Sequence, residues 1–322
     1  MKRPTVFLSL AVLITAACGG AVWVYEGSWG KGGSGDGELK HPEEVAAAIF
    51  GNVYVADTEN NRIQHFTATG SFLGKWGSRG SGPGQFNKPT GIALAPNGVV
   101  YVADSLNYRI QYFSATGSFL GAWGSKGREA GKFGKPATVE VVAPNRVYVA
   151  DAGNDRIQYF TPAGSFLGMW GVHGAGNGEF DTPAGLAAAP NGNIYVADAG
   201  NDRVQYFTPI GVFRGKWGIR GGGQGQFQRP EGVLVGPTGR VFVADTANHR
   251  VQYFTAAGSF LSLFGERGSG PGQFLFPVGV ALSLAGDRLY VADAVNNRIQ
   301  YFKDTEYAVS PTSLGRVKAL FR

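Results

Sequence analysis

The sequence predicts an all-β protein built from six copies of one unit, and three observations support this. Glycine accounts for 51 of the 322 residues, about twice its usual share of roughly 7%. The chain is 43% hydrophobic and only 16% charged, which excludes a disordered chain. The string Val-Ala-Asp returns at intervals of 47 or 48 residues, ending at Asp57, Asp104, Asp151, Asp198, Asp245 and Asp293.

Each copy reads as four short strands separated by turn residues. In the second copy we expect strands at residues 91–94, 99–103, 109–113 and 118–124. A four-stranded antiparallel unit of this length, repeated six times, is typical of a β-propeller, in which stacked blades bury each other's faces. The predicted fold class is therefore all-β, a six-bladed β-propeller of four-stranded antiparallel blades.

The two ends of the chain predict how the ring closes. The sixth copy stops after its third strand, at Phe302, and no fourth strand follows. A matching segment stands at the other end, because Trp29 lies 47 residues before Trp76. We expect residues 22–30 to supply the missing strand, so that the N-terminal strand completes the last blade.

The repeats resemble those of the NHL-repeat family. The segments YVADTENNRIQHF (54–66) and GQFNKPTGIAL (84–94) carry the resemblance, which extends over about residues 22–302. The resemblance implies a six-bladed propeller. It implies no single activity, because the family includes RNA-binding domains, protein-interaction domains, receptor ectodomains and a few lyases.

Residues 1–17 have the layout of a signal peptide. Lys2 and Arg3 precede an uncharged apolar stretch, and small residues stand before Cys18, the only cysteine. This arrangement resembles the cleavage box of bacterial lipoproteins, in which Cys18 becomes the lipidated N-terminus of the mature protein. Plain secretion and an uncleaved anchor remain alternatives, since the stretch approaches the roughly 20 residues that span a bilayer.

The expected domain organisation is a signal peptide at 1–17, a propeller at 18–302 and a basic tail at 303–322. The expected location is outside the cytoplasm, either anchored to a cell-envelope membrane through the N-terminal lipid or secreted or periplasmic. The net charge of +6 falls to +4 without Lys2 and Arg3. This mild charge, together with export, argues against nucleic acid as a partner. A monomer is expected.

Residues present in every copy are best interpreted as framework. All six copies carry Asp-x-x-Asn-x-Arg after the second strand. We expect the Asp and Arg to form an ion pair, and the Asn to bond turn backbone. The Gly-rich stretches are not phosphate loops, because no helix follows them.

Candidate site residues are those that differ between copies, at the end of the blades where the longest connections gather. The residue before the repeated proline is cationic in four copies, at His41, Lys88, Lys135 and Arg229. Tyr108 and His249 stand in the turn between the second and third strands. A ring of cations at a concave mouth would attract an anionic ligand.

Four glutamates also break the repeat: Glu43, Glu44, Glu140 and Glu231. Together they could hold a divalent cation. No catalytic residue is assigned, and no cofactor is expected apart from such a cation. The favoured function is therefore a non-catalytic binding module that presents its loops to a protein, peptide or glycan. The alternative is a propeller enzyme, a metal-assisted lyase or a lactonase or other hydrolase, with a site at the channel mouth.

Overall fold

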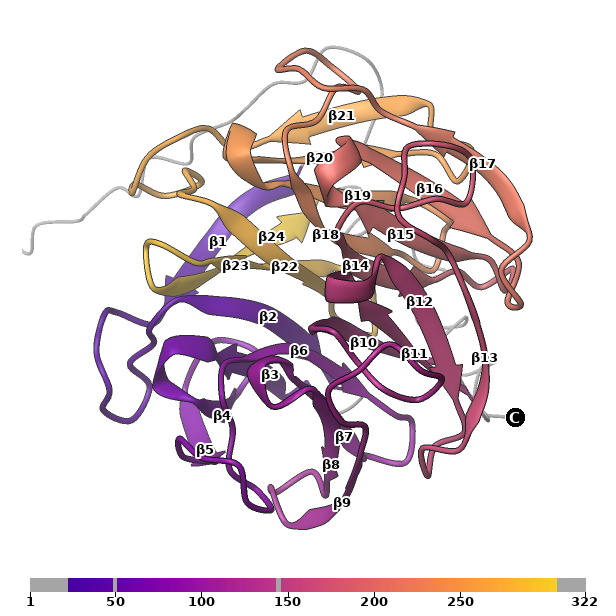
Figure 1. Ribbon diagram of the computed structural model, residues 1–322. Helices are drawn as coiled ribbons and strands as arrows, with labels where there is room; N and C mark the ends of the chain where they lie inside the picture. The colour runs from indigo at the N-terminus through magenta and orange to yellow at the C-terminus, as the bar shows by residue number, and fades with distance from the viewer. Residues whose placement is uncertain (1–22, 49–50, 143–145, 306–322) are drawn as a thin grey trace, which may run out of the picture.

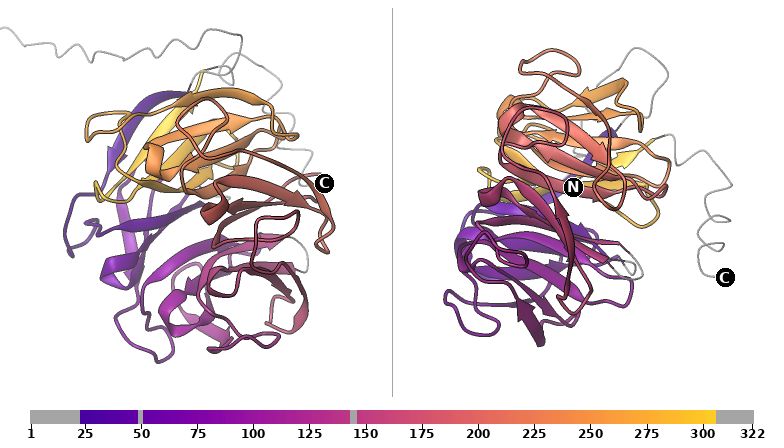
Figure 2. Two further views of the ribbon diagram at one scale, coloured as in Figure 1. Left: turned by 45° about the horizontal axis from the view of Figure 1, so that its top comes forward. Right: turned by 45° about the vertical axis from the view of Figure 1, so that its right-hand side comes forward.

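A computed structural model of the chain describes residues 23–48, 51–142 and 146–305. Within these ranges the chain forms six four-stranded sheets and five single-turn 3-10 helices. The sheets are arranged as blades around a central axis (Figures 1 and 2). The predicted fold class, an all-β six-bladed propeller with antiparallel blades, is confirmed.

In blades one to five the strands run in chain order from the axis outward, and in blade six the N-terminal strand β1 is the outermost. Blade one holds β2 (Pro42–Ala47), β3 (Val53–Asp57), β4 (Arg62–Phe66) and β5 (Phe72–Trp76), and blade two holds β6 (Pro89–Leu94), β7 (Val100–Asp104), β8 (Arg109–Phe113) and β9 (Phe119–Trp123). Blade three holds β10 (Pro136–Val142), β11 (Arg146–Asp151), β12 (Arg156–Phe160) and β13 (Phe166–Trp170), and blade four holds β14 (Pro183–Ala188), β15 (Ile194–Asp198), β16 (Arg203–Phe207) and β17 (Phe213–Trp217). Blade five holds β18 (Pro230–Val235), β19 (Val241–Asp245), β20 (Arg250–Phe254) and β21 (Phe260–Phe264), and blade six holds β22 (Pro277–Leu282), β23 (Arg288–Asp293), β24 (Arg298–Asp304) and β1 (Trp23–Trp29).

The five 3-10 helices occupy the turn between the second and third strands of blades one to five. They are η1 (Thr58–Asn60), η2 (Ser105–Asn107), η3 (Ala152–Asn154), η4 (Ala199–Asn201) and η5 (Thr246–Asn248). Each ends at a residue in the left-handed conformation, such as Tyr108 with φ of 56°.

The core lies between the blades rather than within one. The second strand of each blade is buried on both faces, as in β3 and β7. One hydrophobic cluster joins Tyr54 and Ile63 of blade one to Ile92, Val100 and Phe113 of blade two. Burial of both faces explains the continuous apolar runs, because such strands show no alternation with polar residues.

The predicted closure of the ring is confirmed. Strand β1 pairs antiparallel with β24, with Trp29 opposite Ile299. Trp29 packs against Phe66 of blade one, with ring centroids 5.9 Å apart. Trp23 packs against Phe242 of blade five at 5.5 Å. The N-terminal strand therefore completes blade six and also contacts the blades on either side of it.

The repeated Asp-x-x-Asn-x-Arg motif forms a buried ion pair in every blade, as predicted. In blade one the Nε of Arg62 lies 2.6 Å from the Oδ2 of Asp57, whose side chain is fully buried. The guanidinium also donates to backbone carbonyls of the preceding loop, including that of Glu38. Asn60 donates to Asp57 and to the carbonyl of Gly33. The asparagine thus holds the inter-blade loop, not the backbone of its own turn as we expected.

The predicted signal peptide and Cys18 lie outside the described residues, as does the tail from residue 306. Strand β24 itself continues to Asp304, two residues beyond the expected end of the propeller. Among the residues that the structure describes, no helix is long and apolar enough to cross a membrane.

Candidate functional site

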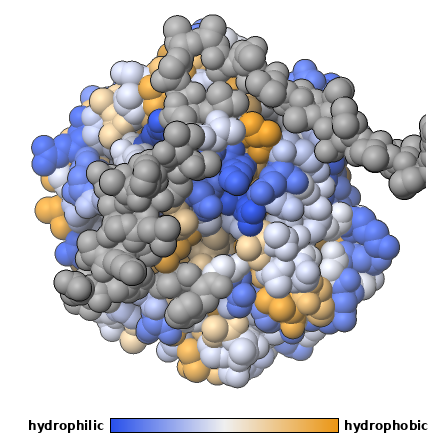
Figure 3. Space-filling view, turned by 180° about the vertical axis from the view of Figure 1, so that it is seen from behind, coloured by the Kyte–Doolittle hydropathy of each residue, from blue (hydrophilic) through white to orange (hydrophobic). Residues whose placement is uncertain are grey.

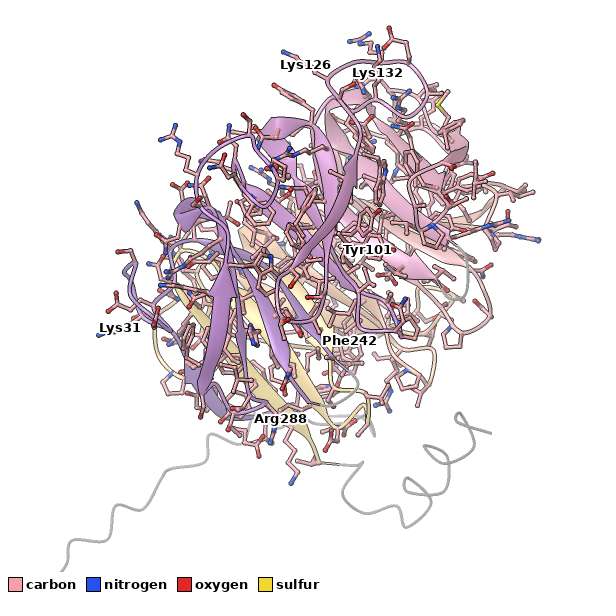
Figure 4. All side chains as sticks on the ribbon, turned by 90° about the horizontal axis from the view of Figure 1, so that it is seen from below. Lys31, Tyr101, Lys126, Lys132, Phe242 and Arg288 are labelled. Atoms are coloured by element: carbon pink, nitrogen blue, oxygen red, sulfur yellow. The ribbon has the colours of Figure 1, made fainter. Side chains whose placement is uncertain are left out.

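The long connections gather at one end of the blades, which we call the top face. These are the loops that lead from each outer strand to the next inner strand, and the turns that carry η1 to η5. Figure 4 shows Lys31, Lys126 and Lys132 on loops at this end and Arg288 at the opposite end. On the face seen from behind in Figure 3, uncovered hydrophobic patches are separated by hydrophilic residues.

The top face opens into a cavity of about 600 Å³ at the channel mouth, which we call the mouth cavity. Residues from all six blades line it. Among the predicted site residues, the lining includes His41, Glu43, Glu44, Lys135, Arg229 and Glu231. Lys88, Tyr108, His249 and Glu140 are not part of this lining.

Most of the predicted cations at the rim already have acidic partners. The Nε of Arg229 lies 2.6 Å from the Oε1 of Glu231. The Nζ of Lys88 lies 2.8 Å from the Oε1 of Glu59. Among the described residues, Lys135 has no such acidic partner. The expected positive ring is therefore largely balanced.

His41 completes this set of pairs. Its Nδ1 lies 3.5 Å from the Oε1 of Glu43, and the two groups form an ion pair when the imidazole is protonated. The Glu43 carboxylate raises the pKa of His41, against the opposing effect of burial. Burial raises the pKa of Glu231, against the lowering effect of Arg229. The rim thus holds acidic and basic groups in neighbouring pairs.

The turn position that contains Tyr108 and His249 has a structural contact in most blades. Its side chain accepts a hydrogen bond from the backbone N–H of the residue before the next blade's proline. Asn61 does so from Lys88 at 2.9 Å, and Asp202 from Arg229 at 2.7 Å. The Nδ1 of His249 does the same from Phe276, at 3.1 Å.

Tyr108 makes no such bond. Its ring instead lies 5.1 Å below the ammonium of Lys126, a cation–π contact. Neither Tyr108 nor His249 reaches the mouth cavity lining. The structure therefore separates these two predicted contacts from the cations around the channel.

Below the mouth lies a second cavity of about 190 Å³, which we call the channel cavity. The inner strands form its walls, and it shares Glu44 and Gly232 with the mouth cavity. Among the described residues that line it, Glu44 and Glu140 alone have a polar side chain; the others are glycine, alanine, valine, leucine or isoleucine.

The repeat explains why Glu44 occupies an unusual place. In four blades its position is glycine, at Gly91, Gly185, Gly232 and Gly279. At these positions the inner strand closely approaches the next blade: a Cβ on Gly232 would collide with the backbone oxygen of Val278. Blade one instead has Glu44 and blade three has Thr138 at this level.

The two channel carboxyls are protonated more readily than ordinary glutamates. Burial raises the pKa of Glu44 to about 8, and repulsion from Glu140 and Glu43 adds to this. Burial raises the pKa of Glu140 to about 7. The carboxyl of Glu44 accepts a hydrogen bond from the N–H of Val45, and that of Glu140 from Ala188, both at 3.1 Å. Neither has a cationic partner among the described side chains.

The four glutamates do not form a compact metal-ligand set. In the described part of the chain, the one group of three whose ligand atoms lie within 4.8 Å of one another is Asp155, His173 and Asp181. Asp155 there accepts a hydrogen bond from the N–H of Thr182, whose hydroxyl donates to Asp181. These carboxylates therefore already hold the loop between blades three and four.

Comparison with known sequences identifies the repeat. The family model for the NHL repeat matches five times, at residues 42–66, 86–113, 180–207, 227–254 and 274–302. The chain is thus a six-bladed propeller with NHL repeats. The repeat of blade three, which contains Thr138 and Glu140 near the axis, is not among these matches. No curated protein sequence matches the chain.

Solved structures with the same fold have several different functions. A protein of unknown function from Bacteroides thetaiotaomicron superposes with a TM-score of 0.68 at 16% identity, covering 88% of this chain and 76% of that one. A gluconolactonase from Xanthomonas campestris gives 0.61 at 14%, covering 88% and 90%. Virginiamycin B lyase from Staphylococcus aureus gives 0.55 at 14%, covering 80% and 79%. At these identities the similarity shows the fold alone.

Proposed function

We propose that this protein is a binding module whose ligand occupies the mouth cavity on the top face. One observation carries the proposal: residues that occur in only one or a few blades gather there, in a cavity of about 600 Å³ to which every blade contributes. A volume of this size is ordinary for a small-ligand pocket. The terminus of a peptide or one to two sugar units would fit.

We further propose that the protein is exported and held at a membrane by a lipid on Cys18. The support is the sequence of residues 1–18, with its basic start, apolar stretch and small residues before the cysteine. Metabolic labelling with a radioactive or clickable fatty acid tests this directly. Label should enter the wild type and not Cys18→Ser; equal labelling of both would refute lipidation.

The binding proposal is tested with a glycan array and a random-peptide display library, each screened against the chain from residue 19. The variant Lys135→Ala/Arg229→Ala should lose at least tenfold in affinity for any ligand retained by the wild type. Arg214→Ala is the matched control, because Arg214 is exposed on the outer strand β17 and lines neither cavity. Equal loss in both variants, or in neither, would place the site elsewhere.

A second candidate function is an enzyme with its site in the channel, in keeping with the lactonase and lyase activities named for two similar folds. The observation that favours it is the raised pKa of Glu44, about 8, and of Glu140, about 7. Carboxyls that titrate near neutral pH suit general acid–base catalysis. The test is hydrolysis of a panel of sugar lactones. Activity that is present in the wild type and lost in both Glu44→Gln and Glu140→Gln would support an enzymatic function. Turnover unaffected by either change would exclude these residues.

A further inference from the structure

The channel cavity combines an apolar wall with two isolated carboxyls. Ala46, Ala93, Ala187 and Ala281 project from four different blades at the level of Glu140. Methyl and isopropyl groups of the neighbouring wall residues offer no side-chain hydrogen bond. Any polar ligand atom that enters must therefore meet Glu44, Glu140 or backbone groups.

These carboxyls differ from the other acids near the axis. Glu231 lies against the guanidinium of Arg229, and Glu43 lies beside the imidazole of His41. Glu44 and Glu140 accept hydrogen bonds from backbone N–H groups, and the side chain of Thr138 adds a neutral hydrogen bond to Glu44. Two acids from blades one and three thus face one narrow space without a counter-charge. A buried carboxylate without a cation is unfavourable, so the site is set up to gain from a cation that enters with its ligand.

We propose that the channel cavity binds a primary alkylammonium group carried on a short methylene chain, such as the side chain of lysine or one end of a diamine. The ammonium would lie between Glu44 and Glu140, and the methylenes would contact the alanine wall. The volume of about 190 Å³ admits such a chain and excludes a larger ring system with substituents. This inference rests on the proposed function, because the ligand enters through the mouth cavity.

A divalent metal fits these walls less well than an ammonium does. Calcium takes six to eight oxygen ligands at about 2.3–2.6 Å. The channel cavity offers two carboxyls, and in the described structure no three acidic or histidine ligand atoms gather within 4.8 Å there. An ammonium has three N–H donors and needs only two or three acceptors. The apolar wall can also contact the methylene groups of an alkylamine, whereas a bare metal ion has no apolar surface to contact it.

The experiment uses isothermal titration calorimetry at pH 7 on the chain from residue 19. The probes are 1,5-diaminopentane, Nα-acetyl-lysine methylamide and the same compound acetylated on Nε, which has no charge. The first two should bind, and the third should bind at least tenfold more weakly. Glu44→Gln and Glu140→Gln should each weaken amine binding at least tenfold. Glu59→Gln is the control, because Glu59 pairs with Lys88 and lines neither cavity.

A second readout follows from proton linkage. An ammonium favours the ionised carboxyls, so its binding should release protons, and the measured heat should depend on the ionisation enthalpy of the buffer. Equal affinity for the charged and acetylated probes would overturn the inference, as would unchanged amine binding by both glutamine variants. Binding of Ca²⁺ or Mg²⁺ that depends on both glutamates, without amine binding, would overturn it in favour of a metal. If a ligand from the glycan or peptide library binds through Lys135 and Arg229 but the amines do not bind, this inference alone is wrong. If no library ligand and no amine binds, the proposed binding function is wrong as well.

Discussion

The strongest quantitative prediction concerns Glu44 and the pH dependence of stability. Replacing Glu44 with Gln keeps the size of the side chain and removes its titration. The folded protein holds the Glu44 proton up to a pKa of about 8, whereas an unfolded glutamate loses it near 4.5. The wild type should therefore be increasingly destabilised relative to Glu44→Gln as the pH rises between these two values.

The sign and size follow from proton linkage. Below about pH 4.5 both states of the wild type hold the proton, and the carboxyl imposes no pH-dependent cost. From there to about pH 8 only the folded state holds it, so the free energy of unfolding falls by about 1.4 kcal/mol per pH unit. The accumulated loss is on the order of 3 kcal/mol at pH 7 and 5 kcal/mol above pH 8. Repulsion from Glu140 and Glu43 acts in the same direction.

The assay is urea unfolding of the wild type and Glu44→Gln at pH 5, 7 and 9, with calorimetric Tm as a second readout. The difference in Tm should grow by roughly 10 °C between pH 5 and pH 9, at about 2 °C per kcal/mol for a chain of this length. Glu59→Gln is the control: Lys88 lowers the pKa of the exposed Glu59, so the linked change in stability lies below about pH 4.5 and the difference from wild type should stay constant from pH 5 to pH 9. A Glu44→Gln difference that stays constant from pH 5 to pH 9 would refute a buried, proton-retaining carboxyl.

Three further predictions test the framework. Gly232→Ala should lower stability by about 1–3 kcal/mol, because its Cβ would collide with the carbonyl of Val278, whereas Gly222→Ala, with no atom closer than 4.0 Å, should be nearly neutral by urea unfolding. Equal effects would contradict the close approach of blades. Removal of β1 in a chain that starts at Lys31 should abolish the cooperative calorimetric transition. Trp29→Ala should lower the free energy of unfolding by about 3–5 kcal/mol. A shortened chain that melts at the original Tm would show that β1 is dispensable. Asp245→Ala should lower the free energy of unfolding by about 3–5 kcal/mol, because it leaves the mostly buried Arg250 without the carboxylate that lies 2.7 Å away. A loss below about 1 kcal/mol would show that Arg250 anchors the loop without the ion pair.

Repetition is the reason that the framework could be predicted. Each strand, turn and ion pair appears six times in the sequence, so a position that holds Asp or Arg in every copy stands out without any alignment. The closing strand was predictable for the same reason, since Trp29 falls into register with Trp76. The partner of the repeated asparagine was not, because the carbonyl of Gly33 belongs to a loop 27 residues away.

The arrangement of the site was predictable only in part. The sequence grouped Glu43 and Glu44 with Glu140 and Glu231 as one acidic set. Neighbouring residues on a strand point to opposite faces, and the structure accordingly separates the set. Glu43 and Glu231 lie at the rim beside basic side chains, while Glu44 and Glu140 face the channel cavity. The pairing of Lys88 with Glu59 depends on the approach of two loops, which the repeat does not encode.

The axis of the ring is where a single substitution has the largest consequence. Around the outside, equivalent residues of different blades lie far apart, so a change in one blade alters one local surface. At the axis the six inner strands converge, and a side chain from one blade faces those of the others. Glu44 in blade one and Glu140 in blade three are thereby brought close enough to repel each other, although 96 residues separate them in sequence. The close packing of Gly91, Gly185, Gly232 and Gly279 keeps the other blades tight, so the polar groups at this depth come from blades one and three. An asymmetric site can therefore arise within a nearly symmetric fold through two or three substitutions, while the ion-pair framework remains intact in all six blades.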